Sequence, residues 1–250
     1  MKVGLPIEMK FEIPNGSTES DHLIEKIRQN VQNGKIVILK NVFSEEQMLH
    51  LKNEIIKWGN NTPIFPHGES PSNYPSLNYH RIDDGSVPSV CPHIFHQYGF
   101  NSINDLDADV SVPLSEVANK LTIIQNLIGE TKFDISLTGL RLKVLQYPEG
   151  GAFLHEHTHP LEPQNVGLIL SLSKIGVDFK KGAAAFMTPE GFVDTVQFHD
   201  IGDVILFRYD LQHEVTPVNP EKATIDWNMP TGKWSLVLEL RDTHNLSHKK

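Results

Sequence analysis

The sequence predicts an α+β fold in which a mainly helical N-terminal part packs on a C-terminal jelly-roll-like β barrel. Two observations predict it. Apolar residues recur at helical spacing in three segments before residue 131. Residues 135–242, in contrast, divide into short β-rich pieces separated by Gly, Pro, Asp and Asn turns. A chain of 250 residues can bury one large core, so we expect a single domain over 1–250, with a helical part at 1–134 and a β core at 135–242.

The first sixty residues predict helix, strand, helix. The first helix is expected over residues 19–32, until Asn33-Gly34 ends the apolar period. The run "KIVILKNV" then predicts a short buried strand. A second helix begins after Ser44, a favourable N-cap residue followed by two glutamates. The stretch "LSEVANKLTIIQNLIGE" predicts a third helix that ends at Gly129.

Between the second and third helices, residues 60–113 are rich in Pro, Gly, Ser, Asn and His and show little periodicity. A long irregular segment in a compact domain is often a lid or a binding loop. We therefore expect this segment to cover a functional site and to select its substrate.

The β core is expected to consist of eight pieces, without an internal repeat. They are "ISLTGLRLKVLQYP", "GGAFLHEHTH", "NVGLILSLS", "GAAAFMTP", "GFVDTVQFH", "GDVILFRYD", "HEVTPV" and "KWSLVLELR".

The composition argues against several classes of partner and of metal site. A net charge of −9 argues against nucleic acid or an anionic membrane as a partner. The single cysteine, Cys91, excludes an internal disulfide framework and a thiolate-rich zinc site. The N-terminus has no apolar signal region, and no run of 18 apolar residues occurs, so we expect a soluble, cytoplasmic protein.

Three histidines stand at every second position in "GGAFLHEHTHP": His155, His157 and His159. On a strand, alternate side chains share one face, so all three are expected on the same side. A mononuclear iron site for oxygen chemistry needs about three protein ligands on one face of the ion, and imidazoles suit Fe(II), Zn and Cu alike. His213, in "LFRYDLQHEVTPV", is the candidate ligand from a distant strand.

In this order, the segments resemble the Fe(II)/2-oxoglutarate-dependent oxygenases. Their double-stranded β-helix carries a His-x-Asp/Glu pair, a distal His and then an Arg-x-Ser pattern. The stretch "YPEGGAFLHEHTHP" is similar to the proximal segment, "GDVILFRYDLQHEVTPV" to the distal segment and "GKWSLVLEL" to the closing strand. The resemblance implies that 1–250 is one oxygenase domain whose β-helix core spans 135–242.

The resemblance also implies a site. Counting from Gly151, as in family members, favours His157 as a metal ligand, with His159 in the position of the usual carboxylate and His213 as the distal ligand. Lys233 and Ser235 correspond to the Arg and Ser that bind the far carboxylate of 2-oxoglutarate. Two residues on the strand before the histidines, Arg141 and Gln146, are further candidates for cofactor binding.

Two departures from the family pattern bear on this site. No Asp or Glu stands two residues after any proximal histidine, so the open alternatives for the third ligand are His159, His155, Glu156 or Glu162. Lysine at position 233 keeps a point charge but loses the bidentate fork of arginine. Halogenating members have Gly or Ala where His159 stands, so halogenation is not expected.

We therefore expect a non-haem, Fe(II)- and 2-oxoglutarate-dependent dioxygenase that hydroxylates or otherwise oxidises a small-molecule substrate with O₂ and releases succinate and CO₂. A homodimer is left open. One alternative is a cupin-like three-His dioxygenase that works without 2-oxoglutarate. The other is a non-catalytic metal- or ligand-binding protein. The stretch "TPEGFVDT" lacks the histidine of the second cupin motif, which favours the first interpretation.

Overall fold

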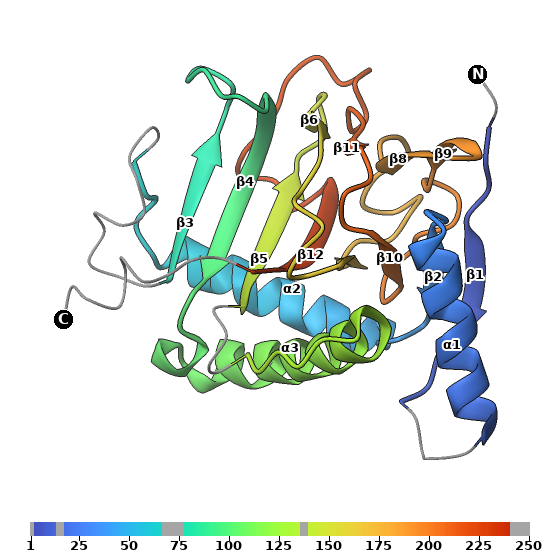
Figure 1. The fold of residues 1–250 in the computed structure, drawn as a ribbon. Helices are drawn as coiled ribbons and strands as arrows, with labels where there is room; N and C mark the ends of the chain where they lie inside the picture. Colours follow the sequence, from blue (N-terminus) through green and yellow to red (C-terminus); the bar gives the residue numbers. More distant parts are fainter. Residues whose placement is uncertain (1–2, 14–17, 67–77, 136–139, 241–250) are drawn as a thin grey trace.

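The computed structural model describes residues 3–13, 18–66, 78–135 and 140–240 (Figure 1). Its helices are α1 (Thr18–Gln32), α2 (Glu45–Asn60), the short 3₁₀ helix η2 (Ile103–Asp105) and α3 (Ala108–Gly129). The strands outside the predicted β core are β1 (Ile7–Lys10), β2 (Val37–Lys40), β3 (Asn78–Asp83) and β4 (His93–Phe100). The others are β5 (Leu140–Tyr147), β6 (Phe153–His157), β7 (Val166–Ser171), β8 (Ala184–Thr188), β9 (Gly191–Asp194), β10 (Val204–Arg208), β11 (His213–Val215) and β12 (Lys233–Leu240).

The strands form one curled sheet in the order β1-β2-β10-β7-β12-β5-β4-β6-β11-β8-β9, with β3 paired to β4. Strand β4 pairs with β5 along residues 96–100 and with β6 at His93 and Ile94. The sheet therefore turns at β4 from one wall to the other and makes the half-barrel of a double-stranded β-helix (Figure 1). The predicted fold class, α+β with helices packed on a β-helix, is confirmed.

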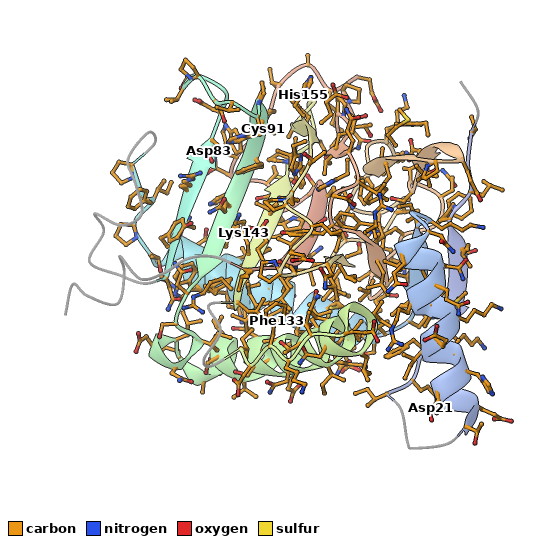
Figure 2. The ribbon with its side chains drawn as sticks, in the orientation of Figure 1. Asp21, Asp83, Cys91, Phe133, Lys143 and His155 are labelled. Atoms are coloured by element: carbon orange, nitrogen blue, oxygen red, sulfur yellow. The ribbon has the colours of Figure 1, made fainter. Side chains whose placement is uncertain are left out.

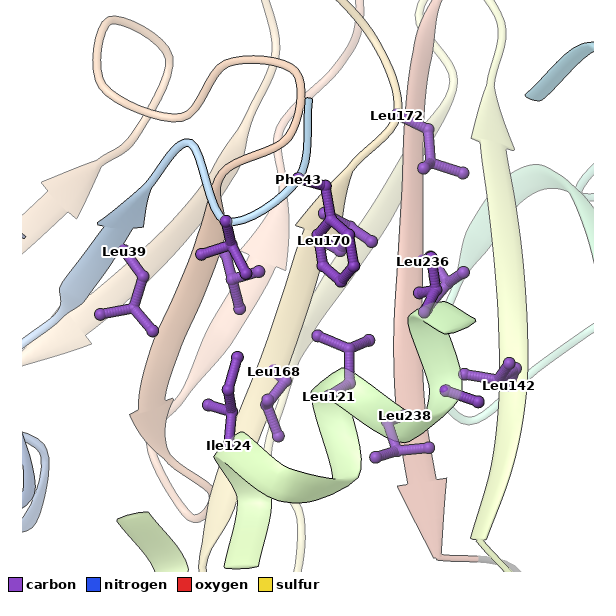
Figure 3. Close-up of a cluster of buried hydrophobic side chains, with 14 of the residues drawn as sticks. Leu39, Phe43, Leu121, Ile124, Leu142, Leu168, Leu170, Leu172, Leu236 and Leu238 are labelled. Atoms are coloured by element: carbon purple, nitrogen blue, oxygen red, sulfur yellow. The ribbon is translucent and has the colours of Figure 1, made fainter. Parts of the chain in front are cut away.

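One wall separates the helices from the barrel interior. Along β12 and β5, Leu236 pairs with Val144 and Ser235 pairs with Leu145, and residues opposite each other in an antiparallel pair share a face. The even-numbered leucines of β5, β7 and β12 pack on Leu121 and Ile124 of α3 (Figure 3). The odd-numbered residues of β12 and β5 are thus left to face the interior of the barrel.

The helices agree with the sequence patterns except at one end. Ser44 caps α2 in a capping box with Gln47. Helix α3 begins at Ala108, earlier than predicted, because Pro113 lies inside its second turn and does not mark its start. None of the helices in the described ranges is both long and apolar enough to cross a membrane.

The middle segment differs most from expectation. The sequence predicts an irregular loop over residues 60–113, but this segment contains β3 and β4, and β4 is a central strand of the sheet. Six of the eight β4 residues are buried, which explains the difference: "HIFHQYGF" has no alternation because both of its faces are covered. Residues 67–77 of the predicted loop lie outside the described residues.

Candidate metal centre

Three of the predicted site residues come together where β6 pairs with β11. One ring nitrogen from each of His157, His159 and His213 can be chosen so that the three atoms lie within 4.8 Å of one another. The ring centroids of His157 and His213 are 4.2 Å apart, and His159 lies 5.0 and 5.3 Å from them. Three donors this close can share one ion.

Strand pairing brings the first two together. His157 on β6 stands opposite His213 on β11, and Val215 stands opposite Leu154. Two residue steps along β11 therefore span three along β6, which is a β-bulge. The bulge lets both Leu154 and His157 line the same cavity.

The bulge also corrects the expectation that all three proximal histidines share a face. Strict alternation fails at this point, and His155 is exposed and contributes no ligand atom to the group. The carboxylate alternatives are not part of the group either. Glu156 accepts a hydrogen bond from the Gln212 amide, and Glu162 is exposed.

Hydrogen bonds orient two of the rings. The Nδ1–H of His157 donates to the carbonyl of His155 at 2.9 Å, and that of His213 donates to the carbonyl of Leu211 at 2.8 Å. A carbonyl can only accept, so each Nδ1 carries the proton and each Nε2 keeps its lone pair. A backbone carbonyl that accepts from the other ring nitrogen is typical of metal-bound histidine.

The electrostatics favour neutral imidazoles. His213 is buried, and burial lowers its pKa to about 3, helped by the neighbouring His157. A neutral ring is the form that binds a metal. His157 and His159 are half-buried, so the group opens to solvent on one side.

An apolar cavity of about 60 Å³ adjoins the three histidines. Leucine, valine, isoleucine and aromatic side chains from both walls line most of it. The residues that border it besides the histidines are Leu145, Tyr147, Leu154, Ile169, Ala184, Phe207, Tyr209, Glu214, Val215, Ser235, Val237 and Glu239, together with Leu168 and Leu238, which also belong to the cluster packed on α3.

Lys233 and Ser235 lie on the same face of β12, inside the barrel. Ser235 lines the cavity, and its Oγ is buried without a hydrogen-bond partner among the described residues. Lys233 is buried, with its Nζ 5.5 Å from the centroid of the Phe179 ring. Burial lowers the pKa of Lys233 to about 8, although Asp194 offsets part of the effect. A buried cation and a buried free hydroxyl fit a carboxylate ligand.

The two other cofactor-binding candidates do not line this cavity. Gln146 lies on the opposite face of β5 from Leu145 and Tyr147, and its amide donates to the carbonyls of Met229 and Thr231. Arg141 lines a separate polar hollow of about 340 Å³ next to α3, and its Nη1 donates to the Leu140 carbonyl. Gln146 does not line the cavity because side chains alternate along β5. Arg141 does not line it because this residue stands at the start of the strand.

Sequence reasoning missed the residues that support the ligands. The Tyr209 ring stacks on His159, and the carbonyls of His155 and Leu211 hold the other two rings. The segment before β4 is hydrogen-bonded to β6, because the His155 N–H donates to the Pro92 carbonyl. In Figure 2 Asp83, Cys91 and His155 lie at the same end of the molecule. Only the position of Tyr209 beside the distal histidine offered a sequence signal.

No protein-family model and no curated protein matches the sequence. Solved structures do match. A prolyl-4-hydroxylase from Pseudomonas putida aligns with a TM-score of 0.55 at 12% identity, covering 88% of this chain and 99% of its own. A full-length protein from Neurospora crassa, solved in complex with alpha-KG, aligns with a TM-score of 0.57 at 12% identity, covering 96% of this chain and 84% of its own.

A dioxygenase for auxin oxidation from rice aligns with a TM-score of 0.57 at 9% identity, covering 94% of this chain and 82% of its own. Identities this low show a shared fold and leave substrates undetermined. The chain therefore has, over most of its length, the fold of the Fe(II)/2-oxoglutarate oxygenases, and it carries a group of three histidines able to bind a metal.

Proposed function

We propose that the protein is a non-haem Fe(II)- and 2-oxoglutarate-dependent oxygenase that oxidises a small molecule. The observation that carries the proposal is the convergence of three imidazoles on one point, two of them with Nε2 free to bind. His157, His159 and His213 would hold the metal, and a ligand set of three histidines would leave other positions on it open for cosubstrate and dioxygen.

The protein's own residues would divide the other tasks. The Lys233 ammonium and the Ser235 hydroxyl would bind the far carboxylate of 2-oxoglutarate. Apolar residues such as Leu145, Leu154 and Val215 would exclude water from the reacting centre. Bound Fe(II) with 2-oxoglutarate supplies dioxygen activation coupled to decarboxylation to succinate and CO₂; the barrel supplies orientation.

The test is succinate formation from 2-oxoglutarate by purified protein with Fe(II) and O₂, driven by a library of small molecules. We expect His213→Ala to abolish succinate formation, because it removes a ligand from the more deeply buried side of the group. His155→Ala is the matched control from the same segment, and its exposed ring predicts near wild-type rates. Anaerobic Fe(II) with 2-oxoglutarate should give a weak visible charge-transfer band that His213→Ala removes.

Two other outcomes would replace the proposal. Oxygen uptake that depends on Fe(II) and ignores 2-oxoglutarate would identify a three-histidine dioxygenase of the cupin kind. The absence of turnover with any library member, together with no charge-transfer band, would overturn the proposal and leave the alternative of a non-catalytic protein.

A further inference from the structure

The three histidines are not supported in the same way. His157 and His213 belong to paired strands, and a backbone carbonyl fixes the orientation of each ring. His159 lies two residues beyond His157, the last residue of β6, so the strand ladder does not fix its position. The ligand in the place of the usual carboxylate thus depends on contacts outside the sheet.

Tyr209 provides such a contact. Its ring lies 4.4 Å from that of His159 with an angle of 9° between the planes, which is a parallel stack. Tyr209 begins the turn between β10 and β11, and its backbone N–H donates to the Asn165 carbonyl at 3.0 Å. The Phe207 ring packs beside the Tyr209 ring, with 6.2 Å between the two ring centroids. The turn that supports Tyr209 also contains Leu211, whose carbonyl orients His213.

We propose that Tyr209 is a positioning residue that holds the His159 imidazole in the ligand plane. The proposal rests on the three-histidine metal site proposed above. A parallel stack fixes the plane of an imidazole and keeps its edge nitrogens pointing along that plane. Because Tyr209 also lines the cavity beside the histidines, its ring limits where the His159 ring can move.

The experiment is a titration of the metal-free protein with Co(II), followed by visible absorption. Tyr209→Phe keeps the ring, and we expect its Kd to stay within about twofold of wild type. Tyr209→Leu removes the stack, and we expect binding about three- to tenfold weaker, the range that one aromatic pair contributes. We also expect a changed Co(II) spectrum, because the third imidazole would be bound only part of the time.

A double-mutant cycle separates positioning from general destabilisation. In a His159→Ala background, Tyr209→Leu should weaken Co(II) binding no further, because its effect is exerted through the missing ring. Phe95→Leu is the matched control: Phe95 stacks on His93 at 4.3 Å and 10°, outside the metal group, and its loss should leave the Co(II) spectrum unchanged. Tyr209→Met replaces the leucine variant should that variant fail to fold.

Wild-type Co(II) affinity and spectrum in Tyr209→Leu would overturn the proposal, and so would equal losses in Tyr209→Phe and Tyr209→Leu. Additive losses with His159→Ala would overturn it as well. In each of these three cases, binding of Co(II) by the wild-type protein through His213 would still support the proposed metal site. Failure of the wild type itself to bind Co(II) would instead overturn the proposed function.

Discussion

Lys233 is 1% exposed, and burial in the barrel lowers its pKa to about 8. The ammonium is therefore charged below that pH and loses its charge as the pH rises through it. We predict that the KM for 2-oxoglutarate increases above about pH 8, because the far carboxylate loses its cationic partner. In Lys233→Arg the increase should disappear, since guanidinium stays charged. Steady-state kinetics across this range test it, and a flat wild-type KM would contradict the role of Lys233.

Single residues also show how far sequence reasoning reaches in the candidate site. The sequence predicts that His157, His159 and His213 form a group, and the structure brings them together. It does not predict that His155 turns outward, because the bulge depends on how β6 pairs with β11, and that strand lies more than fifty residues away. Which of Leu145 and Gln146 lines the cavity likewise depends on which face of β5 the helices cover.

At the level of elements, the helices are predictable because each carries an apolar period and local end signals. Strands β3 and β4 are not. They contain polar residues whose partners come from elsewhere: His96 lies opposite Gln146 of β5 and Ile82 of β3, and Gln97 donates to the Tyr79 hydroxyl. In the sequence alone, a segment with such polar residues looks like a loop, although these residues are buried and make their hydrogen bonds with other parts of the fold.

The polar contacts of β3 and β4 form a directed chain. The His80 Nε2–H donates to the Thr62 carbonyl at 2.7 Å, so His80 Nδ1 accepts from His96 Nε2–H at 2.8 Å. The Tyr98 hydroxyl then donates to His96 Nδ1 at 3.2 Å. This chain uses both histidines in the neutral form. Burial lowers the pKa of His96 to about 3, helped by His80, and burial also lowers the pKa of His80.

The chain predicts acid sensitivity. Below about pH 6.5 these two histidines bind protons in the unfolded state but stay neutral in the folded state. The free energy of unfolding therefore falls as the pH falls toward about 3. One such histidine contributes about 1.4 kcal/mol per pH unit in that window. We predict that His96→Gln is less stable than wild type at pH 7 but loses less stability on acidification. Urea unfolding at several pH values measures this, and equal slopes in both proteins would refute it.

For the whole molecule, the sequence predicts the α+β class and the β-helix at its C-terminal end, but it does not predict how the curled sheet is closed. It assigns the N-terminal residues to no element. They link the two ends of the sheet: β1 is one outer strand and pairs in parallel with β2, and Val3 forms a bridge with Phe192 of β9, the outer strand at the other end. Contacts between such remote parts of a chain leave no local pattern.

This closure predicts a graded effect of truncation. Deleting residues 1–10 removes the pairing of β1 with β2 and the contact of Val3 and Gly4 with Phe192, which includes the hydrogen bond from the Gly4 N–H to the Phe192 carbonyl; deleting residues 1–5 removes only the contact with Phe192. At about 0.5–1.5 kcal/mol for each backbone hydrogen bond, we expect the longer deletion to lower the free energy of unfolding by about 2–4 kcal/mol and the shorter one by about 1 kcal/mol. The longer deletion also uncovers the β2 edge, so light scattering should show self-association that the shorter deletion lacks. Equal stability of both variants and wild type would mean that the two edges hold together without the N-terminal segment.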